Sequence, residues 1–387
     1  MIPGITYIGV DDIDLRFFEN QYPVPKGISY NSYLIEGLRI AVTDTVDQRC
    51  TDQWVALLND ALAGRQPDYL IIHHMEPDHS ANISMLMEKY PDLTLVATAK
   101  AIAMIPQFFG KVSWIERTMV VKEGDTLDLG NGMELTFMVA PMIHWPEVMV
   151  TYIPSRKALI TADAFGRFGA LQYESDDWTS EARRYYVNIV GKYGSQVQTL
   201  LRKLRNTPIE YILPLHGPAL HGDLSKYIKL YDCWSSYRPE TKGVLIAYAS
   251  IYGGTALCAE RLAEILRRRG DAGEVVLFDL CRGDMSEAIS QAFRLSSMVL
   301  ASVTYDGGIF PAMADFISHL ATKTYRNRRV GFIENGSWAP VAGRVMAKQM
   351  DTMTAIEPVE PVVSIKSRMH SETIPVLEAL AASIVAD

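Results

Sequence analysis

The chain has 387 residues, more than one compact core of ordinary size holds, and this length favours two domains. Its composition is that of a globular protein, with 48% apolar and 21% charged residues and a formal net charge of -8. The negative charge argues against nucleic acid as the main partner, because neutralising phosphates requires a basic face. No run of about 18 apolar residues is present, and the first residues lack the segments of a signal peptide, so we expect no membrane span and no leader.

The cysteines of the chain are widely spaced and form no C-x-x-C pair. They are Cys50, Cys233, Cys258 and Cys281. Such spacing argues against a disulfide framework, an iron–sulfur module and a zinc ribbon. A reducing cytoplasm is the simplest compartment for such a chain.

Up to about residue 240, short apolar runs typical of strands alternate with loops that carry His, Asp and Glu. The runs are 69–72, 93–97, 135–140, 158–161 and 211–213. Residues 180–204 follow as a mostly helical connection. Pro239, in the polar stretch 238–242, ends this pattern. We therefore place the domain boundary there and predict domains of residues 1–240 and 241–387.

After residue 240, apolar runs alternate regularly with stretches of helical spacing. The predicted strands are 243–249, 274–278, 298–303, 329–333 and 361–365. The predicted helices are 256–269, 284–293, 311–322, 341–350 and 371–385. This alternation predicts an α/β domain with a parallel sheet covered on both faces. A sheet of this kind binds its ligand beyond the carboxyl ends of its strands, at the switch point.

One loop of the first domain is rich in metal-binding side chains. The run 69–72 opens into His73-His74-Met75-Glu76-Pro77-Asp78-His79. Pro77 restricts its own φ and disfavours helix at Glu76, which makes the loop stiff. A single histidine in a polar loop is usually structural. Two imidazoles and two carboxylates within residues 74–79 instead favour a metal site or catalysis.

Three single donors follow later strand runs. His144 follows Val139-Ala140-Pro141, Asp163 follows the run 158–161, and His216 follows the run 211–213. Each residue alone would fit a structural role. Their shared position, just past a strand, favours adding all three to the metal site.

These motifs together resemble a known fold. A loop H-x-[EH]-x-D-H, followed by a lone His, an Asp and a last His, resembles the metallo-β-lactamase-like fold. Hydrolases of that fold usually carry His where this chain has Glu76. With H-W-P at His144, D-A-F-G at 163–166 and L-H-G-P at 215–218, the whole chain resembles the flavodiiron proteins. The resemblance implies an N-terminal metallo-β-lactamase-like αββα sandwich and a C-terminal flavodoxin-like doubly wound parallel sheet.

The resemblance also assigns metal ligands. It gives one iron to His74, Glu76 and His144, and the other to Asp78, His79 and His216, with Asp163 as the bridge. Glu76 supplies a hard anionic oxygen, which suits redox-active iron better than a zinc site built on imidazole and thiolate. Two metals roughly 3.5–4 Å apart can hold a small molecule between them. Tyr193 matches a tyrosine near the metals of that family and would donate a hydrogen bond there, unless it is only a core residue.

Three loops of the second domain form a candidate cofactor site. The strand 243–249 leads into Ser250, Ile251, Tyr252, Gly253, Gly254 and Thr255, and then into a helix. Backbone N–H groups and the helix dipole of such a loop favour a phosphate, although an ordinary tight turn is the alternative. The next two strands on that edge end in Ser302, Val303, Thr304, Tyr305, Asp306 and Gly307, and in Asn335, Gly336, Ser337 and Trp338. The residues alone support a phosphate-bearing aromatic cofactor, and the resemblance to flavodoxin identifies it as FMN.

The resemblance implies an oxidoreductase that reduces dioxygen to water, nitric oxide to nitrous oxide, or both. It also implies a head-to-tail homodimer, or a dimer of dimers, and an external electron donor such as rubredoxin. Lys366 and Arg368 follow the last strand on the FMN edge and are candidates for docking that donor. The alternatives are a two-zinc hydrolase with an appended flavodoxin-like domain, and a non-catalytic electron carrier that keeps only the flavin.

Overall fold

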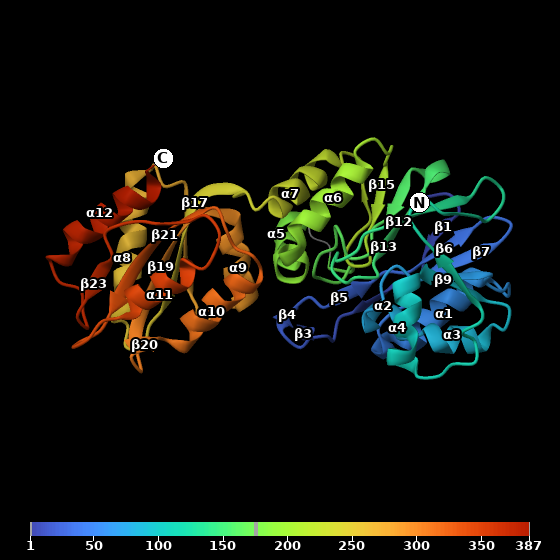
Figure 1. Cartoon of the computed structure of the whole chain (residues 1–387), viewed down its shortest axis with the longest axis horizontal. Coiled ribbons are helices and arrows are strands. Elements are labelled where there is room, and N and C mark those ends of the chain that lie inside the picture. The colour runs from blue at the N-terminus through green and yellow to red at the C-terminus, as the bar shows by residue number, and fades with distance from the viewer. Residues whose placement is uncertain (1, 174–176, 387) are drawn as a thin grey trace. The chain divides into compact units, whose positions relative to one another are not determined.

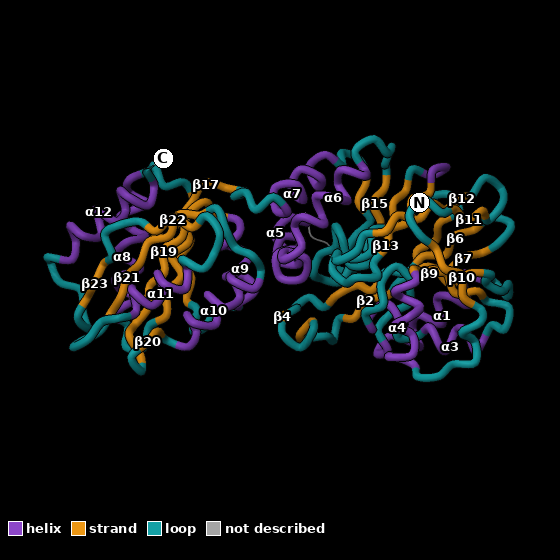
Figure 2. The backbone as a smooth tube through the Cα atoms, viewed as in Figure 1, coloured by secondary structure: helices purple, strands orange, loops and turns teal. Residues whose placement is uncertain are grey.

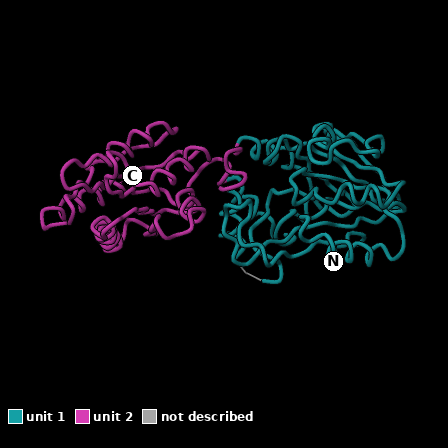
Figure 3. Tube along the Cα trace, turned by 90° about the horizontal axis from the view of Figure 1, so that it is seen from below, with its two compact units in different colours: residues 1–186, 195–232 teal, residues 187–194, 233–387 magenta. Residues whose placement is uncertain are grey.

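The computed structural model describes residues 2–173 and 177–386. Its helices and strands are labelled in Figure 1 and coloured by type in Figure 2. They form two compact units (Figure 3). One contains Met1–Tyr186 and Ser195–Asp232, and the other contains Val187–Gly194 and Cys233–Asp387. We keep 1–240 and 241–387 as proposed domains, because the first strand of the second unit begins at Thr241.

The first unit is built on two six-stranded sheets. In spatial order, the first contains β1 (Ile5–Tyr7), β6 (Tyr33–Glu36), β7 (Ile40–Thr43), β8 (Tyr69–Ile71), β9 (Thr94–Thr98) and β10 (Thr118–Val121). The second contains β11 (Thr126–Asp128), β12 (Glu134–Val139), β13 (Met149–Ile153), β14 (Ala158–Ile160), β15 (Tyr211–Leu213) and β16 (Leu220–His221). Two small hairpin-like pairs join β2 (Val10–Asp12) to β5 (Ile28–Tyr30) and β3 (Phe17–Phe18) to β4 (Tyr22–Pro23).

Central strands of both sheets are buried on both faces. In β7, β8 and β14 every residue is buried, because each sheet is covered on its inner and outer sides. Helix α1 buries one apolar stripe, because its buried residues Trp54, Leu58 and Leu62 recur every four positions. The helices of this unit are α1 (Thr51–Leu62), α2 (Pro77–Ser80), α3 (Ile83–Lys89), α4 (Ala99–Phe109), α5 (Trp178–Tyr185), α6 (Gly194–Leu204) and α7 (Ser225–Ser235).

The helical connection predicted for residues 180–204 is interrupted in the structure. A π-helical turn, η3 (Tyr186–Val190), and a 3-10 turn, η4 (Gly191–Tyr193), separate α5 from α6. Further 3-10 turns are η1 (Gln48–Cys50) and η2 (Pro154–Arg156). Residues 187–194 pack with the second unit, so the chain passes from one unit to the other and back before it enters the second unit for good.

The second unit has a parallel sheet in the order β18-β17-β19-β21-β22. Its strands are β17 (Thr241–Ala249), β18 (Glu274–Asp279), β19 (Leu295–Tyr305), β20 (Gly308–Ile309), β21 (Arg328–Asn335), β22 (Ile356–Pro358) and β23 (Val363–Ile365). Its helices are α8 (Gly254–Arg269), α9 (Met285–Arg294), α10 (Pro311–Thr322), α11 (Ala342–Met350) and α12 (Thr373–Val385). This order, with helices on both faces (Figure 1), is the doubly wound arrangement of flavodoxins.

The predicted fold class is therefore confirmed: an αββα sandwich is followed by a doubly wound parallel sheet. Two details differ from the sequence prediction. The fifth strand, predicted at 361–365, is observed as β23, and an additional short strand that was not predicted, β22, also pairs with β21. The loop after β19 turns back as the short antiparallel strand β20, with Asp306 at φ 48° and Gly307 at φ 71°. Positive φ at both central residues is the geometry of a tight hairpin turn.

Candidate dinuclear metal centre and flavin-binding pocket

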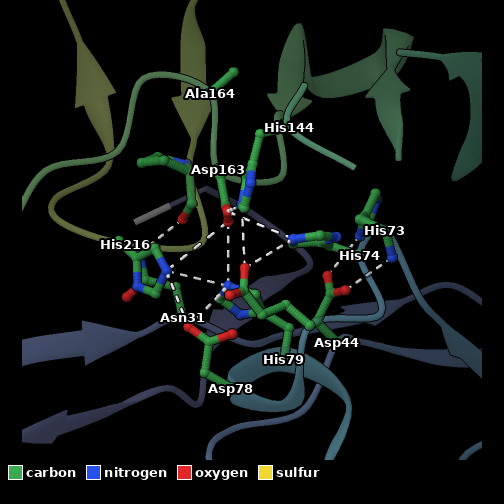
Figure 4. A network of polar contacts seen from close by, with 12 residues as sticks. Asn31, Asp44, His73, His74, Asp78, His79, His144, Asp163, Ala164 and His216 are labelled. Carbon is green, nitrogen blue, oxygen red and sulfur yellow. Dashed lines mark hydrogen bonds and ion pairs between the residues drawn. The ribbon is translucent and has the colours of Figure 1, made fainter. Parts of the chain in front are cut away.

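The seven predicted metal donors come together in the first unit (Figure 4). Each donor lies in a segment that follows one of the strands β8, β12, β14 and β15. The donors are His74, Glu76, Asp78, His79, His144, Asp163 and His216. Part of the predicted loop is a helical turn, α2, with Pro77 in its first position and Glu76 in extended conformation. Proline favours that first position because its missing N–H would be unpaired there anyway.

The donors form two groups. His74, Glu76, His144 and Asp163 make one, and Asp78, His79 and His216 make the other; within each group the ligand atoms lie within 4.8 Å of one another. Glu76 Oε2 lies 3.1 Å from both His74 Nε2 and His144 Nε2. Two donors about 2.1 Å from one ion, at right angles, are about 3.0 Å apart, so this spacing suits a shared metal.

Asp163 faces both groups. Its Oδ2 lies 3.2 Å from His144 Nε2 and 3.7 Å from His74 Nε2. Its Oδ1 lies 3.1 Å from His79 Nε2 and 3.9 Å from His216 Nε2. Each carboxylate oxygen is therefore directed to one group, as a bridge between two ions requires.

Hydrogen bonds behind the donors fix the orientation of two imidazoles. His74 Nδ1 lies 2.8 Å from Glu147 Oε1, which also accepts from the Met75 N–H at 2.9 Å. His216 Nδ1 donates to the Ser29 carbonyl at 2.7 Å. A proton held on Nδ1 leaves the Nε2 lone pair free for a metal. The sequence analysis missed Glu147, which carries no signal beyond its position after Trp145-Pro146.

Several buried polar atoms of the cluster lack hydrogen-bond partners in the described part of the chain. They are Asp78 Oδ1, Asp78 Oδ2, Asp163 Oδ1, His79 Nδ1 and Glu147 Oε2. Buried carboxylate oxygens without partners are costly unless a cation compensates them. The donor set therefore fits bound metal ions. His79, unlike His74 and His216, has no hydrogen bond on Nδ1 to orient its ring.

Carboxylates and imidazoles of the site shift the pKa values of several of its groups. Burial lowers the pKa of His79, but Asp78 and Asp163 outweigh burial and raise it to about 9. Burial likewise lowers the pKa of His144, and hydrogen bonds to Asp163 and Glu76 raise it to about 9. Burial would raise the pKa of Asp163, yet the surrounding imidazoles hold it well below its usual range. Without metal the site therefore takes up protons that an ion must displace.

Neighbouring residues hold the ligand loops from behind. His73, buried beside His74, lies 2.6 Å from Asp44 Oδ2 through Nδ1 and 2.7 Å from Thr151 Oγ1 through Nε2. Asn31 Nδ2 donates at 2.7 Å to backbone carbonyls at positions 214 and 217, on either side of His216. His73 thus supports the site and is not one of the grouped donors. Its support was not identifiable from sequence, because Asp44 and Thr151 come from distant strands.

A buried tyrosine lies against the donors. The Tyr185 ring is 5.5 Å from the His216 ring, and its hydroxyl has no hydrogen-bond partner among the described residues. Burial and the carboxylates Asp163, Glu76 and Asp78 raise its pKa well above the usual value. Tyr193, the residue named from sequence, lies in η4 of the second unit, half-buried, with the Lys192 ammonium 5.8 Å from its ring centre.

A further carboxyl, missed by the sequence analysis, approaches the first donor group from the turn between β3 and β4. Glu19 has φ 48° and its side chain hydrogen-bonds to Glu76. The preceding residue, Phe18, packs edge-on to the His216 ring at 5.5 Å. Burial, and then the nearby Glu76, raises the pKa of Glu19 to about 7.

The second unit contains a cavity of about 1160 Å³ at the carboxyl ends of β17, β19 and β21. All three predicted cofactor loops line it, through Ser250, Ile251, Tyr252, Gly254, Thr255, Val303, Thr304, Tyr305, Asp306, Gly307, Asn335, Gly336, Ser337 and Trp338. Its rim is aromatic, since Tyr252 is 98% exposed and Trp338 is 92% exposed. The cavity thus combines hydroxyl and backbone N–H groups at a helix N-terminus with aromatic rings that are exposed to solvent.

Two of the predicted cofactor residues do not line the cavity. Gly253 caps α8 in the left-handed conformation, with φ 86°. Ser302 is buried, and its hydroxyl accepts from the Phe310 N–H at 3.3 Å. Two segments that the sequence analysis did not assign also contribute, namely α8 near Arg261 and the loop around Ser367.

No helix in the described ranges is both long and apolar enough to span a bilayer. The four cysteines form no disulfide bond in the described part of the chain.

Comparisons with known proteins agree with both sites. Residues 28–217 match the family described as "ODP family beta lactamase". An anaerobic nitric oxide reductase flavorubredoxin of Escherichia coli is 29% identical over 345 residues, covering 87% of this chain and 71% of the relative. The rubredoxin oxygen:oxidoreductase of Desulfovibrio gigas superposes with a TM-score of 0.91 at 25% identity, covering 100% of this chain and 97% of that one.

A second solved structure, the flavodiiron protein of Giardia intestinalis, has a TM-score of 0.90 at 24% identity and covers 100% of this chain and 95% of that one. At 24% identity, this similarity shows a shared fold and no more. Motifs, donor geometry, two-unit fold and relatives all lead to one assignment. The chain is similar, over essentially its whole length, to the flavodiiron proteins.

Proposed function

We propose that this protein is an oxidoreductase that reduces dioxygen to water, nitric oxide to nitrous oxide, or both. Electrons reach a non-haem diiron site from FMN. One relative is named an anaerobic nitric oxide reductase, and one structural neighbour is a rubredoxin oxygen:oxidoreductase. The observation that carries the proposal is Asp163, whose two oxygens face two separate donor groups, one of which contains Glu76.

The proposed roles of the donors follow from their grouping. His74, Glu76 and His144 would hold one iron, and Asp78, His79 and His216 the other, with Asp163 fixing their separation. Bound to these residues, two iron ions would supply electrons and adjacent positions for a diatomic molecule, and FMN would supply one-electron chemistry. Carboxylate donors favour iron over the alternative, a two-zinc hydrolase site.

The chain's other residues shape the reaction space. Glu147 and Ser29 orient imidazoles so that Nε2 faces the centre. Burial of the donors excludes bulk water, which strengthens every charge interaction within the site. The unpartnered Tyr185 hydroxyl is available to donate a hydrogen bond to a small molecule held there. We therefore assign to Tyr185 the role predicted from sequence for Tyr193.

The flavin would lie in the second-unit cavity, its phosphate at the N-terminus of α8 and its ring near Tyr305 and Trp338. Because the ring and the metals of one chain belong to different units, we propose a head-to-tail homodimer, or a dimer of dimers, in which each FMN serves the partner's irons. An external carrier such as rubredoxin would supply electrons, and the cytoplasm would be the compartment.

The decisive experiment combines composition with turnover. Protein purified without oxygen is analysed for iron, zinc and flavin, reduced, and exposed in parallel to dioxygen and to nitric oxide. We expect two irons and one FMN per chain and consumption of at least one gas. Zinc at full occupancy with no gas consumption would support the hydrolase instead, and flavin without metal would support an electron carrier.

A further inference from the structure

The segment between β23 and α12 is joined to two of the flavin-binding loops. The Ser367 N–H donates to Asn335 Oδ1 at 2.9 Å, and Asn335 Nδ2 donates to the Ser367 carbonyl at 3.2 Å and to Thr255 Oγ1 at 3.3 Å. The Ser367 and Ser337 hydroxyls are 2.5 Å apart. Asn335 therefore ties this segment both to its own loop and to the first turn of α8.

The same segment also lies directly over the proposed phosphate loop. A Cβ atom on Gly254 would collide with the Ser367 carbonyl oxygen, so the glycine permits this close approach. Ser367 itself has φ 70°, an unusual conformation for a residue with a side chain. The contacts described above hold it there. Residues 367–369 accordingly line the flavin cavity, beside the three loops predicted from sequence.

The cavity lining contains one positively charged side chain that forms no ion pair with a described residue. Arg261 and Arg368 are the positively charged residues of the lining in the part of the chain that the structure describes. Arg261 Nη1 is 2.7 Å from Glu264 Oε2, so its charge is already compensated. The side chain of Arg368 is exposed and makes no hydrogen bond or ion pair with any described residue; its backbone N–H donates to the Lys366 carbonyl.

A flavin phosphate would need such a cation. The loop 250–255 offers hydroxyls, backbone N–H groups and the positive end of the α8 dipole, but no lysine or arginine. These partial charges compensate a dianion only in part. An arginine fork supplies a full charge and two parallel donors, the arrangement that binds phosphate oxygens most strongly.

We propose that residues 367–369 form a fourth flavin-binding segment and that Arg368 binds the phosphate of FMN. This inference rests on the proposed function only in taking FMN as the cofactor. It reassigns Arg368, which the sequence favoured as a docking residue for the electron donor. Lys366, two positions earlier, is exposed and is not part of the cavity lining, so it serves as a matched control.

The test compares FMN with riboflavin, which lacks only the phosphate. Full-length protein freed of flavin is titrated with each compound, and quenching of flavin fluorescence gives the dissociation constant. Arg368→Gln should weaken FMN binding about tenfold and leave riboflavin binding within twofold of wild type, because a charged hydrogen bond to the phosphate alone is lost. Arg368→Lys should recover part of the loss. Lys366→Gln should leave both constants unchanged.

The possible outcomes separate this inference from the broader proposal. Wild-type protein that binds FMN tightly while Arg368→Gln binds both compounds normally would overturn the inference alone. An equal loss for FMN and riboflavin would also overturn it, since the segment would then act only through structure. Wild-type protein that binds neither compound would contradict the proposed function as well. Raising the salt concentration should weaken FMN binding to wild type more than to Arg368→Gln.

Discussion

The two candidate sites are built in opposite ways. The metal donors other than the half-buried Glu76 are buried. Residues from distant segments support them: Glu147 contacts the donor His74, and Asp44 contacts its neighbour His73. The flavin cavity is open, and its rim presents Tyr252 and Trp338 almost fully exposed. A site that must hold two cations at fixed separation needs a rigid, dry surrounding. A site that exchanges electrons with other molecules needs an accessible edge. Rigidity and access are thus divided between the two units.

The first way to test this contrast is to remove the bridge. Asp163→Asn keeps the shape and one oxygen but loses the charge shared by both donor groups. We expect loss of at least one iron per chain and a fall in gas reduction of about 100-fold or more, since even supporting residues of metal sites contribute 10- to 100-fold. Iron analysis and turnover measure this. The FMN content should not change, and a variant that keeps both irons would refute the bridging role.

Acidification should lower the affinity of the metal site for iron. In the metal-free site the pKa values of His79 and His144 are raised to about 9, so both imidazoles are protonated below that pH. Metal binding must displace these protons, and the affinity for iron therefore falls as pH falls, by about tenfold per pH unit for each displaced proton. Calorimetric titrations in two buffers of different ionisation enthalpy count the protons. A pH-independent affinity between pH 6 and 8 would contradict the assigned environment.

A milder change tests the support behind one ligand. Glu147→Gln retains an oxygen that can accept from His74 Nδ1 but removes the negative charge. We expect the affinity for iron to fall about tenfold, at the lower end of the range for such residues. Competition with a chelator gives the affinity. Glu134→Gln, on the exposed side of β12, is the control and should behave like wild type.

Two tyrosines can be distinguished by paired variants. Tyr185→Phe removes a buried hydroxyl that has no partner, so we expect unchanged stability and iron content but turnover lower by about tenfold. Tyr193→Phe should leave all three quantities as in wild type. The reverse result, with only Tyr193→Phe impaired, would restore the assignment made from sequence.

The smallest expected effect belongs to the open rim. Trp338 is 92% exposed, so Trp338→Ala should change the unfolding free energy by no more than about 0.5 kcal/mol. Loss of an aromatic contact with the flavin ring should weaken FMN binding a few-fold. Riboflavin binding should weaken equally, which separates this contact from the phosphate contact of Arg368. An unchanged flavin affinity would place the ring elsewhere in the cavity.

The sequence predicts those parts of a site whose functional residues lie close together along the chain. The cluster His74 to His79 and the loop Ser250 to Thr255 each concentrate donors or turn residues in one short stretch, and neighbouring strands of the second unit end on one edge by topology alone. Single donors such as His144 were joined to the cluster by their shared position just past a strand, and the family resemblance assigned each of them to a particular iron. The prediction of the regular β/α alternation after residue 240 succeeded for the same reason: each element carries its own periodicity.

What the sequence did not predict depends on contacts between distant segments. Glu147 reaches His74 across 73 positions, and Ser367 reaches Asn335 across 32. Neither residue type is unusual in its local context. Short irregular strands such as β3 and β4 likewise carry too few residues for a readable pattern, which is why the turn bearing Glu19 went unnoticed.

Residues 187–194 belong to the second unit although segments of the first unit lie on both sides of them in the sequence. No single cleavage of the chain therefore separates the two units. Asn188 donates to the Ser286 carbonyl at 3.1 Å, Lys323 Nζ donates to the Asn188 carbonyl at 2.7 Å, and the Tyr237 hydroxyl donates to the Gly191 carbonyl at 2.9 Å. A polypeptide ending at residue 240 keeps residues 187–194 but loses two of these three anchors. Segments of the two units alternate along the sequence, so gene fusion or domain exchange at residue 240 would separate residues 187–194 from the unit with which they pack.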